Sequence, residues 1–136
     1  MEGPSDNLFW SELQCKDGTP YPNKWRDNRA LDLALAFEAV RAMYGKPIKI
    51  LSGYRTEKHN RAIGGARFSQ HVQGRALDLR PPDGVTIAKF YADIKKNAWN
   101  FGIRGLGKYR NFVHIDVRPA DRMVSWSGIG VKDDRA

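Results

Sequence analysis

Apolar residues recur at helical spacing in two segments of this chain. The first segment predicts a helix over residues 27–44, which ends where Gly45 and Pro47 interrupt the pattern. Its apolar positions are Leu31, Leu35, Phe37, Val40 and Tyr44. The second predicts a helix over 86–99, with Thr86 as N-cap and Gly102 as its stop. Its inner side consists of Ile87, Phe90, Tyr91, Ile94 and Ala98.

Alternating apolar and polar residues predict short strands. In residues 74–80, Leu77 and Leu79 point one way while Asp78 points the other, and Pro81 with Pro82 ends the strand. Further strands are expected around 48–50, 103–109 and 112–118, and a short helix followed by a loop over 56–68.

The order of these elements indicates the fold class. Helix, strand, helix and strands predict an α+β fold with an antiparallel sheet flanked by helices. The 136 residues suit one domain, 1–136, because a second core has no room. Within it we expect an irregular N-terminal strap over 1–26 and a disordered tail over 132–136.

Composition and charge narrow the function only slightly. The apolar fraction of 41% and charged fraction of 28% are typical of globular domains. The net charge of +8 suits polyanions such as nucleic acid or an anionic bacterial wall, but the basic residues are scattered without a compact cluster. We therefore expect no nucleic-acid partner, and we expect a monomer.

The sequence shows neither a membrane span nor a secretory signal. No apolar run reaches about 18 residues, and the polar segment 1–7 lacks a basic start followed by an apolar stretch. A single cysteine, Cys15, excludes an intramolecular disulfide and is interpreted as a small, partly buried apolar residue. His59, in a polar stretch, is expected to be exposed or to make a structural contact.

Two separated segments carry candidate metal ligands. His71 lies seven residues before Asp78, with Gly74 allowing a turn between them. Strand periodicity places His114 and Asp116 on one face of a later strand. If the two strands are neighbours, His71, Asp78 and His114 converge. Two imidazoles, a carboxylate and an open position are the arrangement that catalytic zinc prefers.

These motifs resemble those of the M15 zinc peptidases. The segment from Ser69 to Asp78 resembles the signature Ser-x-His-x-x-Gly-x-Ala-x-Asp, and 52–55 and 112–116 match in the right order. The family includes D-alanyl-D-alanine carboxypeptidases, vancomycin-resistance dipeptidases and phage L-alanyl-D-glutamate endolysins. The resemblance implies a hedgehog/D-Ala-D-Ala peptidase-like fold.

The resemblance also implies roles for individual residues. Zn²⁺ is expected on His71, Asp78 and His114, and Arg55 matches the arginine that stabilises the substrate oxyanion. Ser69 and Gln70 are expected to shape the substrate cleft or to hold His71 in place. Tyr54 and Tyr109 lie near the motifs and are expected to line the cleft.

One position departs from the family pattern. Many relatives carry Glu or Asp three residues before the last His ligand, where this chain has Asn111. Asp116 is therefore predicted as the general base. In an alternative alignment with the family motif, Asp116 is the zinc ligand and His114 assists.

The resemblance implies hydrolysis of peptidoglycan stem peptides by a D,D-carboxypeptidase or endopeptidase. We expect a phage endolysin, made in the cytoplasm and released to the cell wall by a holin-type pore protein, or a bacterial wall-remodelling enzyme. The alternative is a catalytically inactive zinc-containing binding module of the same fold, which Asn111 favours.

Overall fold

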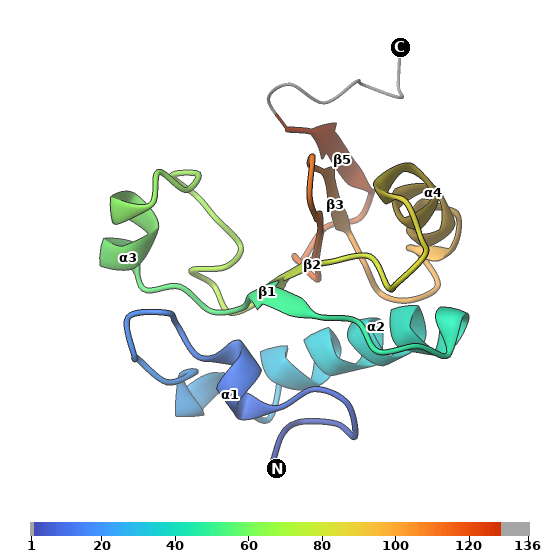
Figure 1. Cartoon of the computed structure of the whole chain (residues 1–136). Coiled ribbons are helices and arrows are strands. Elements are labelled where there is room, and N and C mark those ends of the chain that lie inside the picture. The colour runs from blue at the N-terminus through green and yellow to red at the C-terminus, as the bar shows by residue number, and fades with distance from the viewer. Residues whose placement is uncertain (1, 129–136) are drawn as a thin grey trace.

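Two strands that are distant in sequence lie side by side at the centre of the sheet. They are β2 (Ala76–Leu79) and β4 (Val113–Asp116), in a computed structural model that describes residues 2–128 (Figure 1). The order across the sheet is β1 (Ile50–Ser52), β2, β4, β3 (Gly105–Lys108) and β5 (Val124–Ser127). The adjacency of β2 and β4 brings the two candidate motifs onto one surface.

The sheet is mixed rather than wholly antiparallel. The first four strands pair antiparallel, but β5 runs parallel to β3. The predicted α+β class is confirmed, whereas the parallel edge strand was absent from the sequence prediction. β5 is half-exposed and four residues long, so its alternation gives little signal.

Helix α2 (Arg29–Tyr44) begins and ends at residues with suitable caps. The Asn28 side chain accepts a hydrogen bond from the Arg29 N–H, and Gly45 closes the helix with a φ of 62°. The face that packs on the sheet carries Leu33, Phe37 and Val40. Of the apolar positions that predicted this helix, Leu31 and Leu35 are 45% and 70% exposed and lie outside the core.

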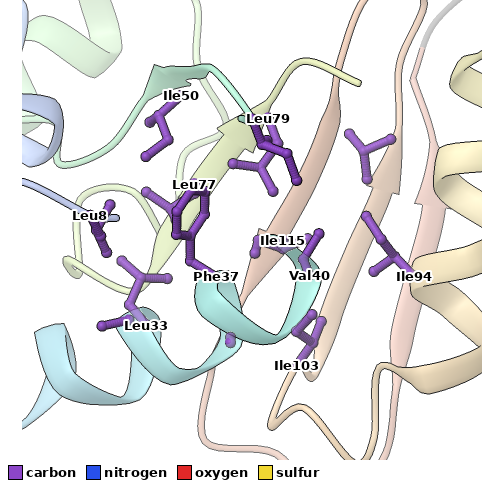
Figure 2. Close-up of a cluster of buried hydrophobic side chains, with 14 of the residues drawn as sticks. Leu8, Leu33, Phe37, Val40, Ile50, Leu77, Leu79, Ile94, Ile103 and Ile115 are labelled. Carbon is purple, nitrogen blue, oxygen red and sulfur yellow. The ribbon is translucent and has the colours of Figure 1, made fainter. Parts of the chain in front are cut away.

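Helix α4 (Ile87–Asn97) packs on the same core as α2. Thr86 caps it as predicted, since its hydroxyl accepts a hydrogen bond from the Lys89 N–H at 3.1 Å. Figure 2 shows Ile94 of α4 in one apolar cluster with Phe37 of α2 and with Leu77 of the sheet. The helices therefore cover one face of the sheet and leave the polar side chains of β2 and β4 on the other.

The N-terminal segment contains more regular structure than expected. Within the predicted strap lie α1 (Trp10–Leu13) and the 3₁₀ turn η1 (Asn23–Trp25). The short helix α3 (Glu57–Ala62) begins the predicted helix-and-loop segment, on the opposite side of the molecule from α4 (Figure 1). The predicted tail, 132–136, lies outside the described residues. Among the described helices, none has the length and apolar character needed to cross a lipid bilayer.

Candidate functional site

His71, Asp78 and His114 meet at the uncovered face of the sheet. Asp78 of β2 is paired with His114 of β4, so both side chains point to the same face. His71 comes from the loop before β2, where Gly74 turns the chain with a φ of 69°. One ligand atom from each of the three lies within 4.8 Å of the other two, and all three side chains are buried.

The Asp78 carboxylate holds the two imidazoles together. Its Oδ1 lies 3.1 Å from His71 Nε2 and 3.2 Å from His114 Nδ1. Burial raises the pKa of Asp78, but the hydrogen bonds and charges of the two histidines outweigh it, so the pKa lies well below its usual range. The carboxylate is therefore ionised in its buried position.

The outer nitrogen of each imidazole has a fixed acceptor. His71 Nδ1 lies 2.7 Å from the Gly53 carbonyl oxygen, and His114 Nε2 lies 2.7 Å from Asp116 Oδ2. Because both partners only accept, these nitrogens carry protons. In the neutral rings, the inner nitrogens then present lone pairs to Asp78. With both rings neutral, three acceptors would face one another in a buried place, so the site suits a cation: either a proton on an inner nitrogen, which makes the hydrogen bonds to Asp78, or a metal ion.

The pKa values of the two histidines shift in opposite directions. Burial lowers the pKa of His71 below its ordinary value, and its contact with Asp78 does not restore it. Burial also lowers the pKa of His114, but hydrogen bonds to Asp116 and Asp78 raise it more, so the net shift is upward. A proton at His114 Nδ1 would occupy the position of a metal ion, because the two compete for the same lone pair.

The Asp116 carboxylate is hydrogen-bonded on the side of the His114 ring opposite Asp78. It is 0% exposed, and Arg118 donates to it from Nε at 2.8 Å and from Nη2 at 2.7 Å. Burial raises its pKa, but Arg118 and His114 outweigh burial and hold the pKa at about 2. Gly105 leaves room for this carboxylate, since a Cβ there would collide with it. The contacts suit a residue that orients His114.

Arg55 contacts the outer oxygen of the same aspartate. Its Nη2 donates to Asp78 Oδ2 at 3.0 Å, and its other nitrogens donate to Ser52 Oγ and Asn60 Oδ1. The guanidinium is thus held in one orientation beside the three candidate ligands. It also lines the cavity above them.

A cavity of about 280 Å³ lies over the three residues. Trp126 forms part of its wall: its ring centroid is 5.1 Å from that of His114, and its Nε1 donates to Tyr109 Oη at 2.8 Å. Gly107 permits this position, because a Cβ there would lie 2.6 Å from the Trp126 ring. Tyr109 stacks on Phe112 with centroids 4.5 Å apart, which completes an aromatic wall.

The other predicted cleft residues divide into two groups. Ser69 and Gln70 line the cavity; Ser69 Oγ accepts from the His71 N–H at 3.1 Å, and Gln70 Oε1 is buried without a hydrogen-bond partner among the described residues. Tyr54 does not line the cavity and packs edge-on against Tyr21, with centroids 6.1 Å apart. A larger hollow of about 530 Å³ adjoins the cavity through a shared wall that includes Ser69.

Sequence reasoning did not assign a site role to Arg118 or Phe112. Both line the cavity, and both flank the strand that carries His114. Period-two spacing after Asp116 points to Arg118, and that spacing was the available signal.

A sequence model described as Peptidase M15 matches residues 6–116. The chain belongs to the peptidase M15 family. This confirms the resemblance, and the matched segment includes His71, Asp78 and His114 but ends before Arg118 and Trp126. M15 peptidases are metallopeptidases, and the three facing acceptors provide a place for a metal ion.

A curated relative of this M15 peptidase comes from Haemophilus influenzae (strain ATCC 51907 / DSM 11121 / KW20 / Rd). It is named "Probable peptidoglycan L,D-endopeptidase MepK" and is 32% identical over 89 residues. The matched region covers 60% of this chain and 44% of the relative. The chain thus spans less than half the length of that protein.

Proposed function

We propose that this M15 peptidase is a zinc-dependent enzyme that hydrolyses peptide bonds in peptidoglycan stem peptides. The observation that carries the proposal is the convergence of His71 Nε2, His114 Nδ1 and Asp78 Oδ1. The other nitrogen of each imidazole already has a hydrogen-bond partner. The family and the name of the Haemophilus relative support a peptidase acting on the bacterial wall.

The separations of Asp78 Oδ1 from the two imidazoles fit zinc. Ligand atoms about 2.0–2.1 Å from a tetrahedral zinc ion lie about 3.3 Å from each other. The Asp78 Oδ1 distances of 3.1 Å and 3.2 Å to the two imidazoles agree with that value. His71, His114 and Asp78 would hold the ion, and all three line the cavity. When bound there, zinc supplies Lewis-acid polarisation of a carbonyl group and makes water nucleophilic near neutral pH.

Arg55 provides a fixed positive charge beside the reacting carbonyl. Its three hydrogen-bonded partners hold the guanidinium in place, so it need not reorganise as negative charge develops on the carbonyl oxygen. Fixed charges of this kind act mainly by stabilising the transition state. We propose that Arg55 stabilises the oxyanion.

Asp116 is better suited to orient His114 than to act as general base. Both its oxygens accept hydrogen bonds, and it contacts the His114 nitrogen opposite the one near Asp78 and does not line the cavity. This geometry favours revising the role that the sequence suggested. It also favours His114 over Asp116 as the ligand, because His114 is the residue that faces Asp78.

The cavity has features suited to a peptide with free carboxylates. Arg55 and Arg118 contribute positive charge, while Tyr109, Phe112 and Trp126 form an apolar wall. Stem peptides and wall polymers are anionic, which the net charge of +8 complements. We propose action on the cell wall as a phage endolysin or a wall-remodelling enzyme, of the D,D-carboxypeptidase or endopeptidase type.

Digestion of defined peptidoglycan fragments, followed by mass analysis of the products, tests this function. The native chain should release peptide products, lose that activity with a chelator and regain it with Zn²⁺. Asp78→Asn, an isosteric change at a ligand, should remove both zinc and activity. Products formed at full rate without metal would contradict the proposal.

A binding module of the same fold is the second candidate. One observation favours it: among the described residues that line the cavity, the only carboxylate is the candidate ligand Asp78, so a free general base is missing there. A binding module would bind peptidoglycan and zinc without releasing products. Sedimentation with purified peptidoglycan, run beside the digestion, separates the two functions.

A further inference from the structure

A second group of metal-ligating side chains lies away from the cavity. Cys15 and Asp17 belong to the segment between α1 and η1, and His59 belongs to α3. One ligand atom from each lies within 4.8 Å of the other two. None of these three residues lines the cavity over His71. The group therefore requires its own explanation.

A tight turn brings Cys15 and Asp17 to the same point. The Cys15 N–H donates to the Thr19 carbonyl, and the Gly18 N–H donates to the Cys15 carbonyl at 3.0 Å. Gly18 has a φ of 97°, a conformation that favours glycine. The turn places the Cys15 thiol and the Asp17 carboxylate within 4.8 Å of each other.

Thr56 joins this turn to α3. Its hydroxyl donates to Asp17 Oδ2 at 2.9 Å and accepts from the His59 N–H at 3.1 Å. Asp17 Oδ1 accepts from the Thr19 N–H at 2.9 Å. The carboxylate is thereby oriented as metal-ligating carboxylates are, with supporting hydrogen bonds from groups around it. The His59 imidazole has no hydrogen-bond partner within residues 2–128.

We propose that Cys15, Asp17 and His59 form a second metal site, which takes Zn²⁺ or another thiophilic divalent ion. A thiolate and an imidazole select such ions over Ca²⁺ or Mg²⁺. On binding, the Cys15 thiol releases its proton to solvent, and the resulting thiolate, the Asp17 carboxylate and the His59 imidazole ligate the metal ion. One thiolate and one carboxylate neutralise the divalent charge.

The geometry requires only a small adjustment. Neighbouring ligand atoms of a tetrahedral zinc ion lie about 3.5 Å apart when one is sulfur. Cys15 is 2% exposed and Asp17 is fixed by hydrogen bonds, whereas His59 is partly exposed and its ring is not hydrogen-bonded. Rotation of the His59 side chain therefore closes the site, and the remaining coordination position faces water beside exposed Asp17.

The site would fasten the N-terminal segment to the wall of the cavity. Asn60 of α3 donates to the Ala66 carbonyl at 2.8 Å and accepts from Arg55 at 3.3 Å. Ala66 and Arg55 both line the cavity over His71. A metal ion on His59 thus fixes the helix that supports one side of the candidate peptidase site.

Metal content and cobalt spectroscopy of the full chain test the proposal. The native chain, dialysed against Zn²⁺, should retain two zinc ions, whereas Cys15→Ser and His59→Gln should each retain one. Lys58→Gln, the exposed neighbour of His59 on α3, is the matched control and should retain two. His59→Gln keeps the test valid if the buried Cys15→Ser change impairs folding.

With Co²⁺, the native chain should show a near-ultraviolet thiolate-to-cobalt charge-transfer band. The band should persist in Asp78→Asn, which isolates this site from the one over His71, and disappear in Cys15→Ser. A native chain that retains one zinc ion and lacks the thiolate band would overturn the proposal. Unchanged zinc content in both Cys15→Ser and His59→Gln would also overturn it.

Discussion

At the scale of single residues, the candidate site depends on which atoms of each side chain already have a hydrogen-bond partner. The Gly53 carbonyl and the Asp116 carboxylate hold the protons of the two imidazoles on the outside. The inner nitrogens are therefore left for a cation. Asp116 is a supporting residue for the same reason, because each of its oxygens already accepts a hydrogen bond from Arg118.

Asp116→Asn should weaken zinc binding by about 10- to 100-fold, since the loss of an outer partner reduces both the orientation and the basicity of a ligating imidazole. Competition with a chromophoric chelator measures this effect. Asp78→Asn, the same change at the inner position, should reduce zinc affinity further. If Asp116→Asn keeps native zinc affinity but loses turnover, Asp116 is the general base instead.

Gly107→Ala should displace Trp126 from the cavity wall. The new Cβ would lie 2.6 Å from the indole ring, and the ring must move because the glycine backbone is part of β3. Overpacking of this kind costs about 1–3 kcal/mol. Tryptophan fluorescence and the KM for a stem-peptide substrate should both change. A native KM and spectrum would show that Trp126 tolerates the added methyl group.

At the scale of elements, side chains from the N-terminal segment fasten it to α2. The Asn7 backbone N–H and side-chain amide both donate to the Glu38 carboxylate at 2.7 Å. Burial raises the pKa of Glu38, but hydrogen bonds from this segment outweigh it and the net shift is downward. The ionised carboxylate is therefore the form that links the two elements.

The Glu38 contact should stabilise the fold at neutral pH and lose its effect in acid. A lowered pKa in the folded state means that the contribution is present above the unfolded value of about 4.3 and declines as pH falls through the folded value. Urea unfolding of the native chain and Glu38→Gln should differ at pH 7 and converge toward pH 3. An equal difference at both pH values would contradict this assignment.

At the scale of the whole molecule, the two helices and the sheet form one core, and the candidate metal site lies on the opposite face of that sheet. Leu77 of β2 packs in the core while the adjacent Asp78 points to the site. Metal binding at Asp78 and His114, as proposed, would therefore join the two central strands on the side that the core does not cover.

Metal removal should lower the thermal stability of the chain. Binding to the folded state alone contributes about 2.7 kcal/mol when free zinc is 100 times its Kd, which raises the Tm by several degrees. Calorimetry of metal-free and zinc-loaded protein measures the shift. The His59→Gln background removes the second proposed site, and Asp78→Asn in that background should abolish the shift. An unchanged Tm after chelation would contradict metal binding at Asp78.

The sequence by itself determined the local elements and the kinds of chemistry available. Periodicity, with Gly45 as a stop and Thr86 as a cap, predicted α2 and α4, because these residues act within one turn of their own helix. Alternation in β2 and β4 determined that Asp78 and His114 would leave the apolar face. The motif from Ser69 to Asp78, together with the segments 52–55 and 112–116 in the right order, indicated the family.

Only the tertiary structure decided which atoms meet. The parallel pairing of β5 with β3 places Trp126 beside His114. The hydrophobic periodicity of each strand does not indicate which other strand it pairs with. The contacts of Asp116 and the approach of His59 to Cys15 likewise depend on packing between distant segments. Local patterns report the direction of a side chain, whereas its partner is set by long-range register and packing.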